Sequence, residues 1–499
     1  MDKFNALIER CQLDKKQFQL DGAKWCLDRE RTENENSIKG GIIADEMGLG
    51  KTILMIGIMH SNPLRRTLIV LPVALVKQWA ATILQMTGQK ALIYHDNRKK
   101  ISKDALRSAP IVLTTYNVVT ICALEDNSPL HTTKWDRVIY DEGHHLRNSQ
   151  TTRHAGCAAL TTDITWIVTG TPIQNKASDL FSLCAVIGIP MSANTFKNPD
   201  FKAHFLNTYV LKRTKIQVGI ALPPLTITTV NVPWSNQTEQ QIAMDIHRSF
   251  HFSKVSPSSA MSDIETALSG EERLSMLIRA RQSCVMPSLM VPYFRKMHDD
   301  GAVTLNASHM AAVMANSKIC AVVDAIISRK DNGAGKLVFC HYIKEIDEIA
   351  TRLSAGGISR VLTYDGRNSR TVNILTEPAD VIILQIQTGC EGLNLQANYS
   401  EIYFASPHWN PAIEDQAIAR CYRIGQQKEV NVFKFIMENF DSIASKDLED
   451  ADDLEEDEEE EDEGTFTIEN YINQVQTAKR TTIADMLEQP TDQDDQIAK

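Results

Sequence analysis

Short apolar segments rich in Val, Ile and Leu alternate with helical patterns twice along this chain of 499 residues. Each segment is bounded by polar or turn residues, which is typical of strands buried on both faces of a parallel sheet. The segments fall into two groups of four, at residues 68–71, 111–114, 137–140 and 166–169, then 336–340, 360–363, 381–384 and 401–404. The pattern therefore predicts an α/β fold with two lobes, each built around a parallel sheet.

The strand pattern disappears between the two halves, where helical stretches rich in Gln, Met, Ser and Arg take its place. Near the C-terminus, apolar residues recur at about a 3.6-residue period, which predicts an amphipathic helix containing Ile468, Ile472, Val475, Ile483, Met486 and Leu487. We expect five parts in chain order: a first lobe, a helical insertion with the inter-lobe connection, a second lobe, an acidic insertion, and a C-terminal helix and tail. Their bounds are 1–230, 231–317, 318–446, 447–464 and 465–499.

The net charge of −11 is concentrated in one segment, because 14 of the 17 residues from 447 to 463 are Asp or Glu. The rest of the chain is slightly basic, which is compatible with a groove for nucleic-acid phosphates. So dense a run of like charges predicts a disordered segment before the C-terminal helix. It could compete with DNA for the basic groove, bind histones or other basic transcription proteins, or serve as a solvated spacer.

Signals for secretion, membranes and zinc binding are not found in the sequence. Charges occur throughout the N-terminal residues, which lack the apolar stretch of a secretory signal. No run of 18 apolar residues occurs, so no membrane partner is expected. Ten cysteines without a Cys-x-x-Cys pair predict reduced, mostly buried thiols.

A glycine-rich loop follows an apolar run at 41–44 and precedes a helical pattern at 53–59. The loop reads Gly48-Leu49-Gly50-Lys51-Thr52, and its glycines let backbone N–H groups approach phosphate oxygens at the start of a helix. Lys51 would reach the β- and γ-phosphates, and Thr52 would bind Mg²⁺. The general P-loop pattern requires a glycine where Asp45 stands, so this loop alone does not establish a nucleotide site.

A second motif supports the nucleotide site. The apolar strand at 136–140 ends in Asp141 and Glu142, 90 residues after Lys51. Asp141 would hold Mg²⁺, and Glu142 would orient and deprotonate the attacking water. An acidic strand end that simply faces solvent is the alternative interpretation, and the preceding Gly-Lys-Thr loop disfavours it.

Several longer segments resemble, in the same order, the motifs of the SNF2 family of superfamily 2 helicase-like ATPases. Asp141-Glu142-Gly143-His144 resembles the Asp-Glu-Gly-His box, and Asp45 occupies its place in the SNF2 form of motif I. The other matching segments lie at 18–25, 68–72, 114–116, 169–175, 211–215, 364–366, 392–395, 409–411 and 416–426. The resemblance implies two RecA-like parallel-sheet lobes with SNF2-type helical insertions, and ATP and Mg²⁺ as cofactors.

The resemblance also assigns roles to residues. It implies that nucleotide is bound by Gln19, Asp45, Glu46, Met47, Gly48, Leu49, Gly50, Lys51, Thr52, Gly392 and Gln416. It implies that catalysis depends on Glu142, Asp141, Lys51, Arg423 and Arg420, with Arg423 as an arginine finger. Thr169, Gly170, Thr171 and His144 would couple the motifs, with His144 between motifs II and III. Adjacent histidines usually point apart, so we do not expect His144 and His145 to bind a metal.

Two details refine the resemblance. The segments Leu146-Arg147-Asn148 and Leu222-Pro223-Pro224 are similar to the branch that contains the helicase-like transcription factor and a termination factor. Its ubiquitin-ligase members carry a RING finger, and this chain has no Cys/His set spaced for one. Motif V departs from the family, because residues 387–392 lack its usual cation and include Glu391. Coupling of DNA to ATP hydrolysis could therefore be weak.

The function expected from the resemblance is ATP-driven translocation on double-stranded DNA, which displaces or remodels bound proteins in transcription regulation. A nuclear location follows from the family alone. One alternative is a helicase of the same superfamily that separates strands. Another is a non-catalytic acidic activator with a decayed ATPase, which intact Lys51, Glu142 and Arg423 disfavour.

Overall fold

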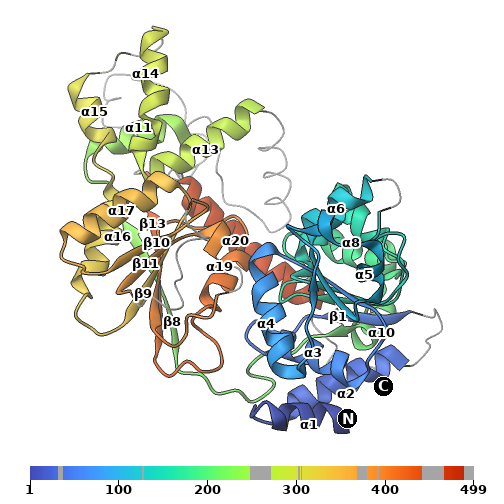
Figure 1. Ribbon diagram of the computed structural model, residues 1–499. Helices are drawn as coiled ribbons and strands as arrows, with labels where there is room; N and C mark the ends of the chain where they lie inside the picture. Colours follow the sequence, from blue (N-terminus) through green and yellow to red (C-terminus); the bar gives the residue numbers. More distant parts are fainter. Residues whose placement is uncertain are drawn as a thin grey trace, which may run out of the picture. The chain divides into compact units, whose positions relative to one another are not determined.

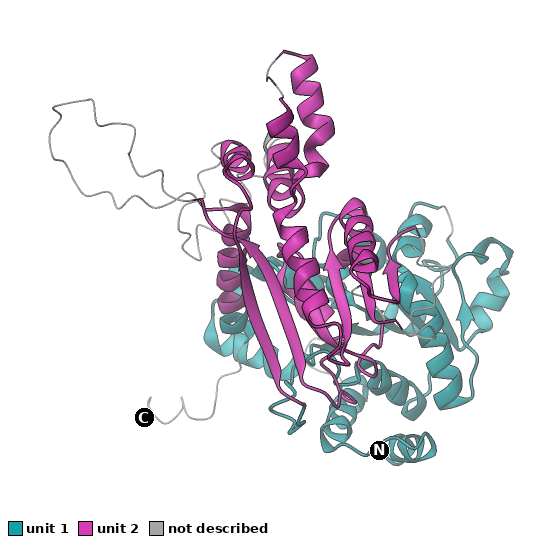
Figure 2. Cartoon of the chain, turned by 90° about the vertical axis from the view of Figure 1, so that its left-hand side faces the viewer, with its two compact units in different colours: residues 1–222, 483–499 teal, residues 223–482 magenta. Residues whose placement is uncertain are grey.

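The computed structural model describes residues 1–31, 38–125, 128–247, 271–301, 304, 306–367, 379–389, 393–440 and 466–487. The chain forms two compact units, Met1–Leu222 with Ile483–Lys499, and Pro223–Thr482 (Figure 2). Each unit contains one sheet whose paired strands are all parallel (Figure 1). The predicted α/β fold with two parallel-sheet lobes is confirmed.

Unit 1 contains a seven-stranded sheet in the order β3-β4-β2-β5-β6-β1-β7. Its strands are β1 (Lys39–Ile43), β2 (Thr67–Leu71), β3 (Leu92–Ile93), β4 (Ile111–Thr115), β5 (Trp135–Asp141), β6 (Thr162–Val168) and β7 (Val210–Leu211). Alternate side chains of the central strands enter two different buried clusters, one on each face. Burial on both faces explains why these strands are apolar runs without polar alternation.

Helices cover both faces of the first sheet. One cluster includes residues of α1 (Asp2–Arg10), α2 (Gln17–Arg31), α3 (Lys51–Ser61) and α4 (Val76–Thr87). The opposite cluster includes residues of α5 (Lys103–Ser108), α6 (Tyr116–Ala123), α7 (Thr152–Ala158), α8 (Ala177–Ile187), α9 (Ala193–Phe196) and α10 (Pro199–Tyr209). The loops that follow β1, β2, β4, β5 and β6 therefore gather at the carboxyl edge of one sheet, where ligands bind in such folds.

Unit 2 contains a six-stranded sheet in the order β10-β11-β9-β12-β13-β8. Its strands are β8 (Leu225–Val232), β9 (Gly335–Cys340), β10 (Val361–Tyr364), β11 (Val381–Gln385), β12 (Tyr399–Phe404) and β13 (Val430–Met437). The edge strand β8 pairs with β13 along its whole length, whereas the sequence pattern assigned residues up to 230 to the first lobe. Most of β8 is exposed, so it lacks the buried apolar run that identified the other strands.

Helices occupy the described residues between β8 and β9, where the sequence predicts a helical insertion. They are α11 (Gln237–His247), α13 (Glu271–Val285), α14 (Val291–Asp299), α15 (Ala307–Val313) and α16 (Ser317–Ser328). The remaining helices of unit 2 include α17 (Ile343–Ala355), α18 (Ile386–Gly389) and α19 (Pro411–Ile418). Within the described parts of the chain, no single helix is long and apolar enough to cross a membrane, although the bent pair α15 and α16 passes by length and composition.

The chain leaves the second sheet after β13 and returns to the same place in α20 (Ile468–Leu487). Thr467 donates its backbone N–H to Asn439 Oδ1 at 3.2 Å, and Asn470 Nδ2 donates to the Met437 carbonyl at 2.9 Å. Ile468, Ile472 and Val475 are buried in the unit 2 core, on a helix that lies where the sequence predicts one. The acidic run at 447–463, predicted to be disordered, lies outside the described residues.

Candidate active site

The loop between β1 and α3 has the backbone of a phosphate cradle. Gly48 and Gly50 have φ values of +90° and +82°, a conformation that glycine adopts without steric cost. Gly50 is the N-cap of α3 and offers no side chain to the first N–H groups of the helix. Lys51 Nζ donates to the carbonyls of Asp45 at 2.7 Å and Glu46 at 3.3 Å. A cation and a helix N-terminus thus belong to one loop, which suits a phosphate group.

Two acidic residues of this loop, Asp45 and Glu46, are held by residues 213–215, which follow β7 in the sequence. Asp45 is 1% exposed and accepts from Arg213 Nε at 3.0 Å and Nη2 at 2.5 Å. Glu46 accepts from the backbone N–H and Nζ of Lys215, both at 2.7 Å. These carboxylates anchor the loop. This explains why Asp45 replaces the glycine of the general pattern, and it gives roles to Arg213 and Lys215 that sequence reasoning missed.

Gln19 of α2 lies directly against the glycine loop. A Cβ atom added to Gly50 would lie 2.8 Å from Gln19 Nε2, which is closer than such atoms can approach. Leu49 is buried at 2% exposure, and Thr52 lies in the first turn of α3. The structure therefore brings together the α2 and loop residues that the sequence assigned to nucleotide binding.

The segment after β6, which contains Gly170, packs against the same glycine loop. A Cβ atom at Gly170 would lie 2.8 Å from Met47 Cγ and 3.4 Å from Lys51 Nζ. Thr169 is fully buried and donates its backbone N–H to the Ile43 carbonyl at 3.0 Å. Thr171 donates its backbone N–H to Thr169 Oγ1 at 3.2 Å. Only a glycine fits at position 170, and the predicted coupling residues 169–171 lie beside the loop.

Asp141 lies at the carboxyl end of β5 with its side chain buried. Its Oδ2 accepts from Trp79 Nε1 at 2.6 Å, and its carbonyl accepts from the Tyr116 hydroxyl at 2.7 Å. Burial and the neighbouring Glu142 carboxylate raise the pKa of Asp141 to about 7, while the Trp79 hydrogen bond and the charge of Lys51 oppose the shift. A divalent cation would offset this cost of burying a carboxylate, so the site fits Mg²⁺. The structural support from Trp79 was missed in the sequence.

Glu142 adopts the left-handed conformation, with φ of +50°, which is uncommon for a residue with a side chain. Its Oε2 lies 3.3 Å from His144 Nδ1. The rings of His144 and His145 stack with their centroids 4.7 Å apart, so the expectation that adjacent histidines point apart is wrong here. They lie in a short 3-10 helix, Gly143–Leu146, rather than in a strand. None of the described His, Cys, Asp and Glu side chains form a group of three suited to a metal.

A polar link joins the Asp-Glu-Gly-His segment to the segment after β6. Arg147 Nη1 donates to Gln174 Oε1, and Gln174 Nε2 donates to Thr171 Oγ1 at 3.2 Å. The backbone N–H groups of Gln174 and Asn175 donate to Asp179 Oδ2 at 3.0 and 2.7 Å. The sequence assigned the link between motifs II and III to His144, and the structure shows a hydrogen-bonded link through Arg147. The sequence marked Arg147 only as part of the branch-specific segment Leu146-Arg147-Asn148, without this role.

Arg420 and Arg423, which the sequence assigned to catalysis, follow α19 in unit 2. Arg420 donates from Nε to the Gln416 carbonyl at 3.2 Å, and Arg423 donates from Nη1 to Asn394 Oδ1. Burial, together with the charge of Arg420, lowers the pKa of Arg423 to about 10. Gln416 is 2% exposed, and its Nε2 has no hydrogen-bond partner in the described part of the chain. Two neighbouring cations of this kind suit an anionic ligand; Gly392 lies outside the described residues.

Two family models match the chain. The SNF2-related domain matches residues 18–289, and the helicase conserved C-terminal domain matches residues 317–425. The chain belongs to the SNF2-related family. This confirms the predicted family. The first match covers most of unit 1 and continues into unit 2, and the second lies within unit 2.

Relatives of this SNF2-related protein differ in length. The probable global transactivator of Orgyia pseudotsugata multicapsid polyhedrosis virus is 28% identical over 455 residues, which cover 86% of this chain and 87% of that protein. Human chromodomain-helicase-DNA-binding protein 6 is 27% identical over 476 residues, 85% of this chain but only 17% of that protein. The solved Sulfolobus solfataricus SWI2/SNF2 ATPase core in complex with dsDNA is 22% identical, covers 85% of this chain and 88% of its own, and has a TM-score of 0.38.

Proposed function

We propose that this SNF2-related protein hydrolyses ATP when bound to double-stranded DNA and uses the energy to move along the duplex. The observation that carries the proposal is the assembly in unit 1. The glycine loop with Lys51, the residues around Gly170 and the buried Asp141 meet at one sheet edge. An idle remnant of a site has no need to retain a buried carboxylate beside a lysine, because both groups cost free energy there.

Different residues have different roles in the proposed phosphoryl transfer. The glycine loop and Lys51 bind the phosphates, and Thr52 with Asp141 would hold Mg²⁺, which supplies charge neutralisation when bound. Glu142 orients the attacking water and accepts its proton, and His144 Nδ1 lies 3.3 Å from that carboxylate. Arg423, with Arg420, stabilises the charge that develops on the transferred phosphoryl group. Gln19 would contact the base, and Gln416 is the nucleotide-binding residue that the family resemblance assigns to unit 2.

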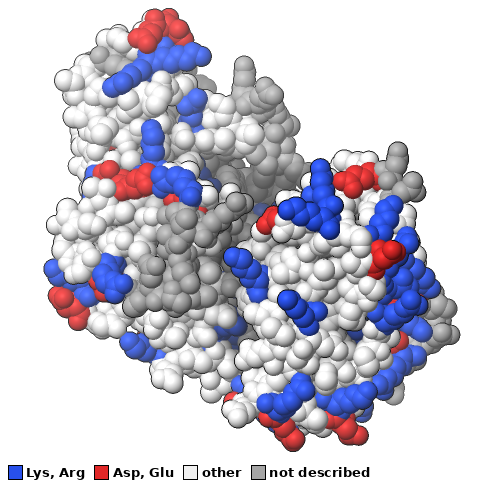
Figure 3. All heavy atoms as spheres, in the orientation of Figure 1, with Lys and Arg blue, Asp and Glu red and all other residues white. Residues whose placement is uncertain are grey.

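Binding to duplex DNA is supported by charge and by the relatives. Lys and Arg side chains are spread over the face of unit 1 that Figure 3 shows, with fewer carboxylates among them. Basic surfaces bind the phosphate backbone independently of sequence. Human chromodomain-helicase-DNA-binding protein 6 is named for DNA binding, and the viral relative is named a transactivator. Both names agree with action on DNA in transcription. The proposal adds a nuclear location and histones or transcription proteins as further partners.

A strand-displacement experiment tests the proposal. With ATP, the protein should release a third strand from a triplex on duplex DNA, because movement along the duplex removes what is bound to it. A forked duplex should stay closed under the same conditions. Opening of the fork would show a strand-separating helicase instead, and failure to release the triplex despite ATP hydrolysis would overturn translocation.

A further inference from the structure

The C-terminal helix α20 carries polar side chains that meet the segment containing α19. Its residues Ile468, Ile472 and Val475 are buried in the core of unit 2. Its polar residues Gln476, Lys479 and Arg480 reach residues 408–415. We propose that α20 is a positioning element for α19, and through it for Arg420 and Arg423. This inference rests on the proposed function, because it concerns how those arginines are held for ATP hydrolysis.

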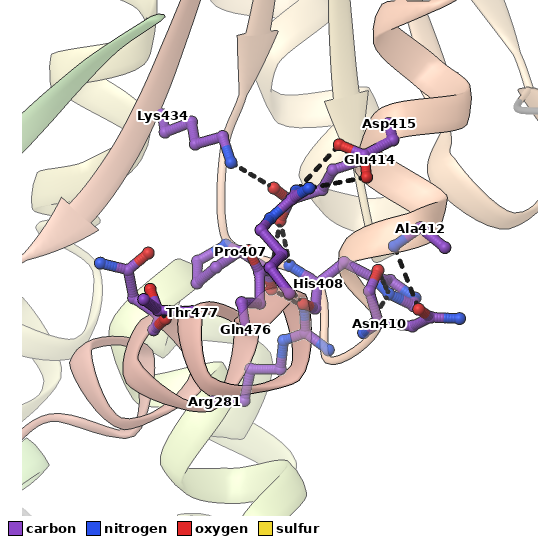
Figure 4. Close-up of polar contacts among 12 residues, drawn as sticks. Arg281, Pro407, His408, Asn410, Ala412, Glu414, Asp415, Lys434, Gln476 and Thr477 are labelled. Atoms are coloured by element: carbon purple, nitrogen blue, oxygen red, sulfur yellow. Dashed lines mark hydrogen bonds and ion pairs between the residues drawn. The ribbon is translucent and has the colours of Figure 1, made fainter. Parts of the chain in front are cut away.

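Glu414 in the first turn of α19 is the centre of the contact. It is fully buried and accepts from the His408 backbone N–H at 2.8 Å, from Gln476 Nε2 at 2.7 Å and from Lys434 Nζ at 2.6 Å (Figure 4). These donors come from the loop after β12, from α20 and from β13. A buried carboxylate with three donors of separate origin permits one position of its helix, since any shift leaves a charge without partners.

A second contact fixes the next residue of α19. Arg480 donates from its two terminal nitrogens to Asp415 at 2.7 and 2.8 Å. Bidentate pairs of this kind restrict orientation as well as distance. Gln476 Nε2 also donates to the His408 carbonyl, and Lys479 Nζ donates to the Trp409 carbonyl at 3.3 Å. The helix α20 therefore holds both α19 and the turn that leads into it.

The helix α20 is itself anchored at its start. Glu469 forms an ion pair with Lys318 of α16, in which both side chains are fully buried. The same carboxylate accepts the Met437 backbone N–H at 2.9 Å. Behind the turn, Arg281 of α13 donates to the Pro407 carbonyl at 2.5 Å (Figure 4). The position of α19 is thus set by elements distant in sequence, with α20 as the link to the end of β13.

The route from α19 to the arginines is short. Glu414 and Asp415 come directly before Gln416, whose carbonyl accepts from Arg420 Nε at 3.2 Å. The Arg420 carbonyl in turn accepts the Leu395 backbone N–H at 3.1 Å. A rotation of α19 would move this hydrogen-bonded group, although none of the residues of α20 has to touch ATP. Gln476 and Arg480 are therefore positioning residues.

The test compares two arginines, one that pairs with α19 and one that pairs within its own helix. Arg480→Met removes the contact to Asp415, and Arg352→Met is the matched control, because Arg352 pairs with Glu348 at 2.7 Å within α17. Both pairs are partly exposed, 43% and 42% for Arg480 and Asp415, 31% and 33% for Arg352 and Glu348, so neither should change the unfolding midpoint greatly. Gln476→Leu is a second variant that acts through Glu414.

In duplex-stimulated ATP hydrolysis, Arg480→Met and Gln476→Leu should lower kcat about 10-fold, because small misplacements of a catalytic group are costly, while the KM for ATP changes less than about 2-fold. Arg352→Met should match wild type. The double variant Asp415→Arg, Arg480→Asp restores an ion pair and should recover more than half of the lost rate.

Two results would overturn the role of α20: a kcat within 2-fold of wild type in both variants, or an equal loss in the Arg352→Met control. Wild-type protein that hydrolyses no ATP would instead overturn the proposed function on which this inference rests, so the two failures are distinguishable.

Discussion

Asp141 and Glu142 are adjacent residues placed in different surroundings. The carboxylate of Asp141 is buried against Trp79, while Glu142 takes a left-handed backbone and approaches His144. Asp141 remains partly protonated near neutral pH in the absence of nucleotide, since its pKa lies at about 7. Burial that raises a carboxyl pKa is a cost to folding, and function is the reason to retain it.

That cost predicts a pH-dependent stability. The folded protein holds the Asp141 proton more tightly than the unfolded chain, because its pKa of about 7 exceeds the ordinary value of 3.8. The free energy of unfolding should therefore fall as the pH rises between those values, by about 1.4 kcal/mol per unit of pKa at most. Asp141→Asn removes this pH dependence. The urea midpoint of Asp141→Asn should therefore rise relative to that of wild type as the pH is raised from 5 to 8. Parallel midpoint curves for the two proteins would contradict a raised pKa.

Arg423 should act on the rate and leave ATP binding largely intact. In Arg423→Ala, turnover should fall by roughly 10³-fold or more, the range typical of arginine fingers. The proposed ATP-binding loop lies in unit 1 and does not include this residue, so affinity measured with a fluorescent ATP analogue should stay near wild type. A collapse of affinity with an unchanged rate per bound ATP would show that Arg423 is a ground-state ligand.

Motif residues could be assigned from the sequence because their spacing reflects backbone geometry. The glycines at 48 and 50 are needed for positive φ values, and Gly170 is needed because Met47 leaves no room for a side chain. Their supports were not assigned. Arg147 and Arg213 bind through partners 27 and 168 residues away, and no local pattern specifies such partners.

At the scale of elements, buried strands were predictable and exposed ones were not. Strands such as β2 and β4 are fully buried, so they form continuous apolar runs. The edge strand β8 is mostly exposed and rich in threonine, and it is recognisable only through its pairing with β13. The helix α20 was visible from its apolar period, but its polar contacts with α19 follow from tertiary packing.

The described residues that flank the acidic segment lie together in unit 2, because Thr467 and Asn470 bond to Asn439 and Met437. Deletion of residues 447–463 should therefore preserve folding and ATP hydrolysis. If the segment competes with DNA, the deletion should also tighten duplex binding, most strongly at low salt where screening is weak. Unchanged affinity across a salt series would leave only a spacer or a protein-binding role.

Truncation before residue 447 is the matched comparison. It removes α20 as well as the acidic run, and with it the buried Ile468, Ile472 and Val475. The truncated protein should have a lower unfolding midpoint and little ATPase activity, because buried aliphatic side chains typically contribute about 1.5–3 kcal/mol each. A fully active truncated protein would contradict the placement of α20 in the core of unit 2.

At the scale of the whole molecule, the proposed function assigns different parts of one reaction to the two units. Unit 1 holds the glycine loop and the carboxylates, and unit 2 holds Arg420 and Arg423. The proposed ATP hydrolysis therefore requires both units to act on a single ATP, as lobes that close during turnover do. Duplex DNA should favour that state. Because motif V is altered, whether duplex DNA raises the ATPase rate is more informative than the size of the increase.

The most direct measurement is phosphate release from ATP with and without duplex DNA. Wild-type protein should hydrolyse ATP faster with duplex, and Lys90→Ala, which removes an exposed lysine of unit 1, should behave the same. Lys51→Ala should release no phosphate above background while keeping the wild-type unfolding midpoint, because it removes the lysine of the phosphate loop. Turnover in Lys51→Ala equal to wild type, or a wild-type rate that duplex DNA does not raise, would contradict the account.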